Sequence, residues 1–173
     1  MIKRAILLVS VALFALGVGV YTKLELSPPL LNKNQLSTGF FLSDTYGKQH
    51  SINEWQGKIK VINFWATWCS PCLKEIPEFI SLQNQYALQG VQFIGIAIDN
   101  KDAINKYLST IQINYPILIA ENEGLILARQ MGNSINSVPF TIIINQQGVI
   151  LERYFGEINT EKLEEKIRSL IKI

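Results

Sequence analysis

The sequence of 173 residues has the length of one domain plus an appendage, and 48% of its residues are hydrophobic. Only 17% are charged, which excludes an intrinsically disordered chain. The net charge of +2 originates in residues 1–23, which contain three basic residues and no acidic one. The remainder, with 13 basic and 14 acidic residues, is nearly neutral, which argues against a nucleic-acid-binding surface.

The first 23 residues predict a membrane-directed leader. Lys3 and Arg4 precede an uncharged apolar run over residues 5–21, which as a helix would reach about 25 Å. A cleavable signal peptide has the same pattern, but the only approximation to a cleavage site is Gly17-Val18-Gly19, so we favour an uncleaved signal anchor. A buried core helix fits the glycines and the basic pair less well than either of these.

The charge of the leader also predicts its orientation. Under the positive-inside rule the basic head stays in the cytoplasm, and the single-pass anchor places the domain on the periplasmic, extracytoplasmic side. Disulfides persist in that compartment. Residues 24–39 contain Pro28-Pro29 and predict a semi-extended linker, so the expected organisation is an anchor over 1–23, this linker and a domain over 40–173.

The domain is predicted to alternate strands and helices. In chain order the pattern indicates a β-hairpin (40–42 and 49–52), a strand (58–65), a helix (72–86), a strand (91–98), a helix (102–111), a strand (115–119), a helix (123–131), a second hairpin (140–145 and 149–154) and a helix (160–171). The run over 91–98 lacks alternation of apolar and polar residues, which indicates a strand covered on both faces. We therefore expect an α/β three-layer sandwich with a mixed central sheet.

Two cysteines carry the chemistry that the sequence predicts. Cys69 and Cys72 stand where a strand has ended and a helix begins, so the helix N-terminus can stabilise a thiolate on Cys69. Pro71 suits the first helical turn. Cys72 is then placed to attack a mixed disulfide formed on Cys69. A structural disulfide would restrain almost nothing at this spacing, and a metal site would have only His50, an expected surface residue, as a further soft ligand.

The stretch VINFWATWCSPCLKEIP (61–77) resembles the active-site segment of thioredoxin-fold oxidoreductases, in particular the membrane-anchored TlpA/ResA-like branch. The resemblance extends from about residue 40 to the C-terminus and implies a thioredoxin-like sandwich with an N-terminal β-hairpin extension. Pro77 matches the kinking proline of the family helix. Val138 and Pro139 match the cis-proline loop, which in the family pairs with the substrate chain, and Phe155-Gly156 matches a terminal glycine turn.

The resemblance also assigns roles to single residues. Asn63 occupies the place of a buried aspartate in thioredoxin, while Glu75 matches a glutamate of the ResA-like proteins. A carboxylate near the buried thiol can take its proton during resolution, so we expect the base to be Glu75. The alternative is a surface acid in the first helical turn. Trp68 is expected to shield Cys69 and contact the substrate, and Trp65 to lie in the core.

The sequence thus predicts an extracytoplasmic thiol-disulfide oxidoreductase that reduces protein disulfides. No cofactor is expected beyond the redox-active pair, because the chain has no dinucleotide or phosphate-loop motif. In related anchored proteins the targets include apocytochrome cysteines, and a membrane thiol transporter supplies electrons. This chain has NSINSVPF (133–140) in place of the GVYGxPE-type loop of the dedicated cytochrome-maturation reductases.

Two other functions remain as alternatives. A peroxiredoxin-like thiol peroxidase would need a PxxxTxxC frame, which the residues before Cys69 do not provide. A non-catalytic peptide-binding module on the same fold would use the Pro139 loop and leave the thiols without a role, although both cysteines are present.

Overall fold

The computed structural model describes residues 39–171. The predicted anchor and all but the last residue of the predicted linker lie outside this range, so their expected structure stays a prediction. Within residues 39–171, no helix has both the length and the apolar character needed to cross a membrane.

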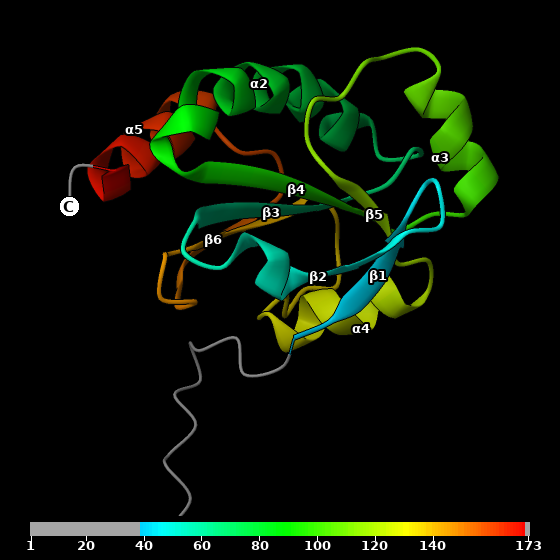
Figure 1. The fold of residues 1–173 in the computed structure, drawn as a ribbon. Coiled ribbons are helices and arrows are strands. Elements are labelled where there is room, and N and C mark those ends of the chain that lie inside the picture. The colour runs from blue at the N-terminus through cyan, green and yellow to red at the C-terminus, as the bar shows by residue number, and fades with distance from the viewer. Residues whose placement is uncertain (1–38, 172–173) are drawn as a thin grey trace, which may run out of the picture. The chain divides into compact units, whose positions relative to one another are not determined.

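Seven strands form one mixed sheet in the order β2-β1-β5-β4-β3-β6-β7 (Figure 1). The strands are β1 (Phe41–Asp44), β2 (Gln49–Ser51), β3 (Ile59–Trp65), β4 (Val91–Ala97), β5 (Ile117–Ile119), β6 (Phe140–Ile144) and β7 (Ile150–Phe155). The pairs β3–β4 and β4–β5 are parallel, and the hairpins at both edges are antiparallel. The mixed sheet confirms the predicted fold class.

Four α-helices and two short 3-10 helices complete the described part of the chain. They are η1 (Ile52–Trp55), α2 (Ser70–Tyr86), η2 (Ala87–Gln89), α3 (Lys101–Leu108), α4 (Glu123–Gln130) and α5 (Thr160–Ile171). In Figure 1, α2 and α5 lie over one face of the sheet and α4 lies below the other. The predicted three layers are therefore present.

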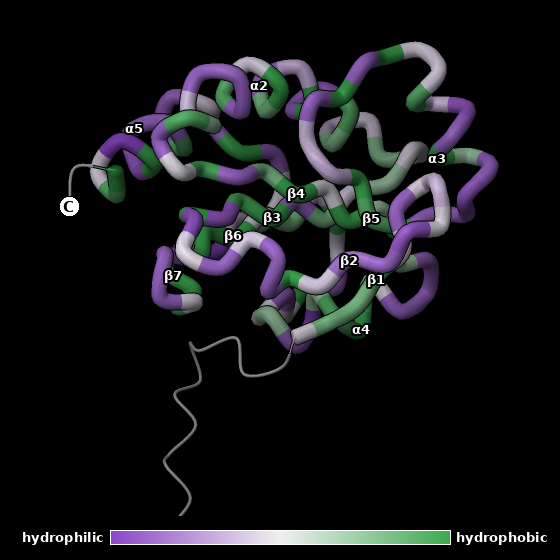
Figure 2. The backbone as a smooth tube through the Cα atoms, in the orientation of Figure 1, coloured by the Kyte–Doolittle hydropathy of each residue, from purple (hydrophilic) through white to green (hydrophobic). Residues whose placement is uncertain are grey.

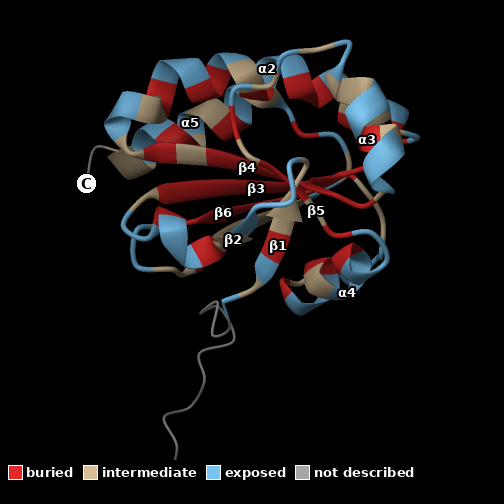
Figure 3. Cartoon of the chain, turned by 45° about the vertical axis from the view of Figure 1, so that its right-hand side comes forward, coloured by how far each residue is buried: buried red, intermediate tan, exposed pale blue. Residues whose placement is uncertain are grey.

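The central strands are buried on both faces, as their apolar sequences predict. Along β3, Val61 and Trp65 join the core on the α2 side, while Ile62 and Phe64 join a second core on the α4 side. Figure 2 shows the strands at the centre as mostly hydrophobic, and Figure 3 shows β3, β4 and β6 as buried while the helices expose their outer sides. Side chains that alternate between two cores explain why these strands are mostly apolar, and the polar residues Lys60, Asn63 and Thr141 within them are themselves buried.

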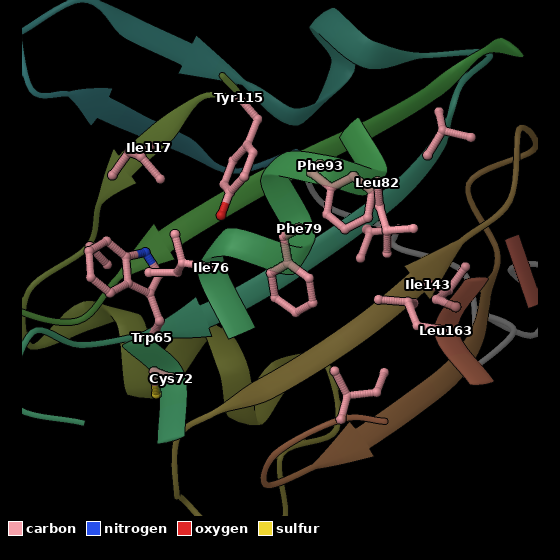
Figure 4. Packing of buried hydrophobic residues seen from close by; sticks show 14 of the residues in the cluster. Trp65, Cys72, Ile76, Phe79, Leu82, Phe93, Tyr115, Ile117, Ile143 and Leu163 are labelled. Atoms are coloured by element: carbon pink, nitrogen blue, oxygen red, sulfur yellow. The ribbon is translucent and has the colours of Figure 1, made fainter. Parts of the chain in front are cut away.

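The core between α2 and the sheet is built from aromatic and branched side chains. The rings of Phe79 on α2 and Phe93 on β4 lie 5.5 Å apart, and Tyr115 lies 6.1 Å beyond Phe93. Figure 4 shows these rings in the same cluster as Cys72. The second cysteine is thus packed into the main core, which fixes the start of α2 on the sheet.

The N-terminal hairpin holds His50 in a way that the sequence did not indicate. Its ring lies between two carboxylates, with Nδ1 2.9 Å from Glu54 Oε2 and Nε2 3.1 Å from Asp44 Oδ2. The ring stacks on Trp55 at a centroid distance of 6.0 Å. The expectation of an ordinary surface residue is therefore wrong, because 12% of the His50 side chain is exposed and both ring nitrogens are engaged.

Raising the pH is expected to weaken this hairpin. The hydrogen bond to Glu54 is the main cause that raises the pKa of His50, with a further contribution from Asp44 against the opposing effect of burial. Because the pKa of His50 is raised in the folded state, the stabilisation by the protonated ring is complete below the pKa of the unfolded chain, about 6.5. It is lost as the pH rises through the pKa of the folded protein. His50→Ala should therefore lower the free energy of unfolding more at pH 6 than at pH 8.5, by less than about 1 kcal/mol.

Urea unfolding of both proteins at the two pH values measures this difference. Gln49→Ala, at the exposed neighbouring position, serves as the control and should show the same loss at both pH values. Equal losses at pH 6 and pH 8.5 for the His50 variant would contradict the assigned charge pairing.

Candidate active site

The two cysteines form a disulfide at the start of α2. Cys69 is the N-cap residue of the helix, and its Sγ accepts a hydrogen bond from the backbone N–H of Cys72 at 3.3 Å. Pro71 occupies the first turn, where no partner exists for a backbone N–H. The helix therefore begins at Ser70 instead of residue 72, because the cysteine sulfur itself caps it.

The two sulfur atoms of the disulfide differ in their surroundings. Cys69 is 5% exposed, whereas Cys72 is completely buried. A nucleophile from another protein can therefore approach the pair only from the Cys69 side. In the reduced protein the positive end of the helix dipole favours the thiolate on Cys69, which is the form that attacks disulfides.

The two tryptophans of the WATWC segment differ in the same way. Trp68 is 69% exposed beside Cys69, while Trp65 is 1% exposed and packs against Tyr107 at 5.5 Å. Both positions agree with their expected roles as surface and core residues. Gly95 on β4 leaves room for this packing, because a Cβ atom at this position would lie 2.6 Å from Ile117 Cδ1 and 3.1 Å from Trp65 Nε1, so that these side chains would have to shift.

A cis peptide bond joins Val138 and Pro139. Phe140 pairs with Phe64 in the sheet, so Pro139 lies beside the carboxyl end of β3, from which the chain continues to Cys69. Val138 is partly buried and packs against the cluster that contains both cysteines. The expected cis-proline loop is therefore present, and the sheet register brings it to the end of β3 that leads to the disulfide.

Glu75 is a buried carboxyl group one turn after Cys72. It is 4% exposed, and its Oε1 accepts a hydrogen bond from the backbone N–H of Ile158 at 2.5 Å. Its Oε2 is buried and has no partner among the described residues. Burial raises the pKa of Glu75 to about 7, against the lowering effect of the Ile158 N–H, and the charge of Glu157 adds to the rise. The alternative of a surface acid is therefore wrong.

Asn63 is buried on β3, on the same face as α2. Its Nδ2 donates a hydrogen bond to Thr141 Oγ1 at 2.9 Å, and both residues are at most 3% exposed. In this fold the neutral amide thus links β3 to β6 instead of providing a titratable group. Sequence reasoning missed Thr141, because the pairing joins residues 78 positions apart.

Removal of this amide is expected to destabilise the fold. Asn63→Ala leaves the Thr141 hydroxyl buried without its partner, which should lower the free energy of unfolding by about 1–3 kcal/mol. Urea unfolding of the oxidised protein measures the loss. Adding Thr141→Val to the Asn63 variant removes the unpaired hydroxyl group and should recover part of the lost free energy of unfolding. Wild-type stability of the single variant would show that the hydrogen bond is not formed.

The family model of AhpC/TSA matches residues 34–153, more than half of the chain. The chain belongs to the AhpC/TSA family. Among the proteins similar to it are thiol-disulfide oxidoreductases named ResA. The ResA of Halalkalibacterium halodurans is 30% identical over 159 residues, which cover 91% of this chain and 88% of the relative. The ResA of Geobacillus kaustophilus is 28% identical over 169 residues, which cover 97% of this chain and 94% of the relative.

Solved structures agree with the sequence relatives. A thiol:disulfide interchange protein of the thioredoxin family from Chlorobium tepidum superposes with a TM-score of 0.67 at 27% identity, and the match covers 77% of this chain and 93% of that one. This AhpC/TSA protein is therefore a ResA-like thiol-disulfide oxidoreductase with a thioredoxin fold, and its substrates are proteins. The predicted family, fold and thiol-disulfide oxidoreductase activity are confirmed.

Proposed function

We propose that this protein reduces disulfides of extracytoplasmic proteins through Cys69 and Cys72. The observation that carries the proposal is the disulfide at the start of α2, with Cys69 on the outer side and the core around Cys72. In the reduced protein the Cys69 thiolate attacks one sulfur of the substrate disulfide. A mixed disulfide forms, and the first substrate thiolate leaves.

Glu75 acts in the second step of this reaction. Its carboxylate takes the proton from the Cys72 thiol, and the resulting thiolate attacks Cys69 Sγ and releases the second substrate thiolate. The products are a substrate dithiol and the Cys69–Cys72 disulfide, so two electrons pass from the protein to the substrate. A pKa of about 7 suits this role, because the group can accept and release a proton near neutral pH.

Val138, Pro139 and Trp68 form the substrate-binding part of the site. The backbone N–H and C=O of Val138 have no hydrogen-bond partner among residues 39–171, so they are free to pair with an extended substrate segment. The exposed indole of Trp68 offers an apolar surface beside Cys69. No cofactor is required, because the cysteine pair itself carries the electrons; undiminished turnover after dialysis against a chelator tests this.

We expect the carboxyl group of Glu75, one turn after Cys72, to favour electron flow from the protein to the substrate. A carboxylate at Glu75 opposes thiolate formation in the reduced protein, and a less stable reduced form makes a stronger reductant. Equilibration with glutathione should therefore give a reduction potential nearer to that of thioredoxin, about −270 mV, than to that of DsbA, about −120 mV. A value at the oxidising end would overturn the assignment as a reductase.

The proposed location rests on the basic and apolar leader. A membrane anchor over 1–23 would hold the domain on the periplasmic side, where a membrane thiol donor would return the protein to its reduced form. Fractionation of cells that make the full chain tests the anchor, and protease added outside the cytoplasmic membrane should degrade the domain. A shortened protein in the soluble fraction would show that the leader is cleaved.

A further inference from the structure

Lys60 is a buried cation that lacks a carboxylate partner among residues 39–171. It lies near the start of β3, between β4 and β6, and is 4% exposed. Its Nζ donates hydrogen bonds to the backbone carbonyls of Trp55 and Lys58, both at 3.3 Å. None of the four salt bridges formed within the described residues includes Lys60. Burial lowers the pKa of this amine.

A polar pocket adjoins this amine. Its volume is about 370 Å³, and three segments line it: the η1 region, β3 and the turn between β6 and β7. The lining residues are Ile52, Asn53, Gln56, Lys60, Gln146, Gln147 and Gly148. None of them is acidic, and four carry a carboxamide, which can donate two hydrogen bonds through its nitrogen. The pocket therefore combines one cation with several neutral donors.

The carboxamides around Lys60 are free to bind a ligand. The side-chain amides of Asn53, Gln56, Gln146 and Gln147 make no hydrogen bond within the described part of the chain, although the backbone groups of several of them do. Two long hydrogen bonds to carbonyl dipoles offset only part of the cost of burying a charge, and an anion would offset much more. The buried amine of Lys60 and the carboxamide N–H donors around it are the groups that bind an oxyanion.

We propose that this pocket binds a compact oxyanion, with Lys60 as its counter-charge and the surrounding carboxamides as hydrogen-bond donors. Inorganic phosphate and a free carboxylate share the required chemistry. The pocket lies at the amino end of β3, whereas the disulfide follows its carboxyl end, so the two sites occupy opposite ends of the sheet (Figure 1). Binding of an anion in this pocket does not depend on the direction of electron flow at the disulfide.

Calorimetric titration of the full chain with inorganic phosphate, and separately with acetate, tests the site at constant ionic strength. We expect saturable binding of at least one of these anions. The anion that binds shows whether the pocket takes a phosphate or a carboxylate. Lys60→Met keeps the length of the side chain and should weaken this binding by about tenfold or more. Lys58→Met is the matched control, since Lys58 lies two positions earlier and its carbonyl is unchanged; it should bind within about twofold of the wild type.

Two further measurements keep the result unambiguous. Disulfide exchange by the Lys60 variant should equal that of the wild type, which shows that the variant is folded. Gln147→Ala, on the β6–β7 turn, should weaken binding by a few fold without a change in charge. Heats for the wild type that match a sodium chloride control with both anions would overturn the proposal, as would wild-type affinity in the Lys60 variant.

Discussion

Cys69→Ser is expected to reduce disulfide exchange to the uncatalysed rate, whereas Cys72→Ser should accumulate a covalent complex with the substrate. Of the two cysteines only Cys69 has any exposed surface, so its loss removes the nucleophile. Cys72 is fully buried and can act only on the sulfur of Cys69, so its loss leaves attack intact and stops release.

Mass spectrometry after mixing each variant with a disulfide substrate distinguishes the two outcomes. The mixed disulfide should appear with the Cys72 variant and disappear when a small thiol is added. Ser70→Ala, an exposed change between the two cysteines, is the control and should keep turnover. Full activity of the Cys69 variant, or a trapped complex on Cys72 instead of Cys69, would contradict the assigned order of attack.

Glu75→Gln is expected to slow resolution of the mixed disulfide by about a hundredfold and to stabilise the oxidised protein at alkaline pH. Both effects have one cause. Burial raises the pKa of Glu75 to about 7, so the charged form is a competent base but an unfavourable buried group. Glutamine has nearly the same shape and can still accept the hydrogen bond from the Ile158 N–H.

The sign of the effect on stability follows from the raised pKa. The folded protein binds the proton more tightly than the unfolded chain, so this stabilisation is present below the usual value of about 4.5 and is lost as the pH rises to about 7. Between pH 4.5 and pH 8 the free energy of unfolding of the wild type should therefore fall by about 3 kcal/mol more than that of the variant. The titration of His50 cancels in this comparison, since both proteins retain it.

Urea unfolding of the oxidised proteins and stopped-flow decay of the mixed disulfide measure the two effects. The wild-type decay rate should rise as the pH passes through 7, and that of the variant should lack this rise. Glu78→Gln, an exposed acid one turn further along α2, is the matched control and should change neither quantity. A Glu75 variant with normal resolution kinetics and altered stability would assign this carboxyl a purely structural role.

The central architecture could be predicted because the sheet is buried on both faces and its strands are almost continuously apolar. Differences from the predicted boundaries come from local chemistry that hydrophobic patterns do not show. The predicted helix over 102–111 ends at Leu108, since the hydroxyls of Ser109 and Thr110 donate to the carbonyls of Lys106 and Tyr107 and close its last turn. The predicted strand over 115–119 begins at Ile117, after a proline that has no N–H to donate to a sheet.

The cysteines and the proline loop could be predicted because they form short local motifs. The environment of Glu75 could not, since its hydrogen-bond partner Ile158 lies 83 residues away, and the glycine turn that begins its loop does not indicate this contact. The same holds for Lys60, which from the sequence is one polar position in a strand. Only the fold shows that this lysine is buried and that the β6–β7 turn lies beside it.

The two edge strands of the sheet limit how another chain can pair with this domain. The edge strand β2 has three residues, all polar, and the edge strand β7 carries Glu152 and Arg153 beside an irregularity in its register with β6. Edge strands that are short, polar or irregular disfavour pairing with a strand of another chain. We therefore expect an extended polypeptide that binds by main-chain pairing to dock at the unpaired backbone before Pro139, on the side of the sulfur atoms, and not along the edge strands of the sheet.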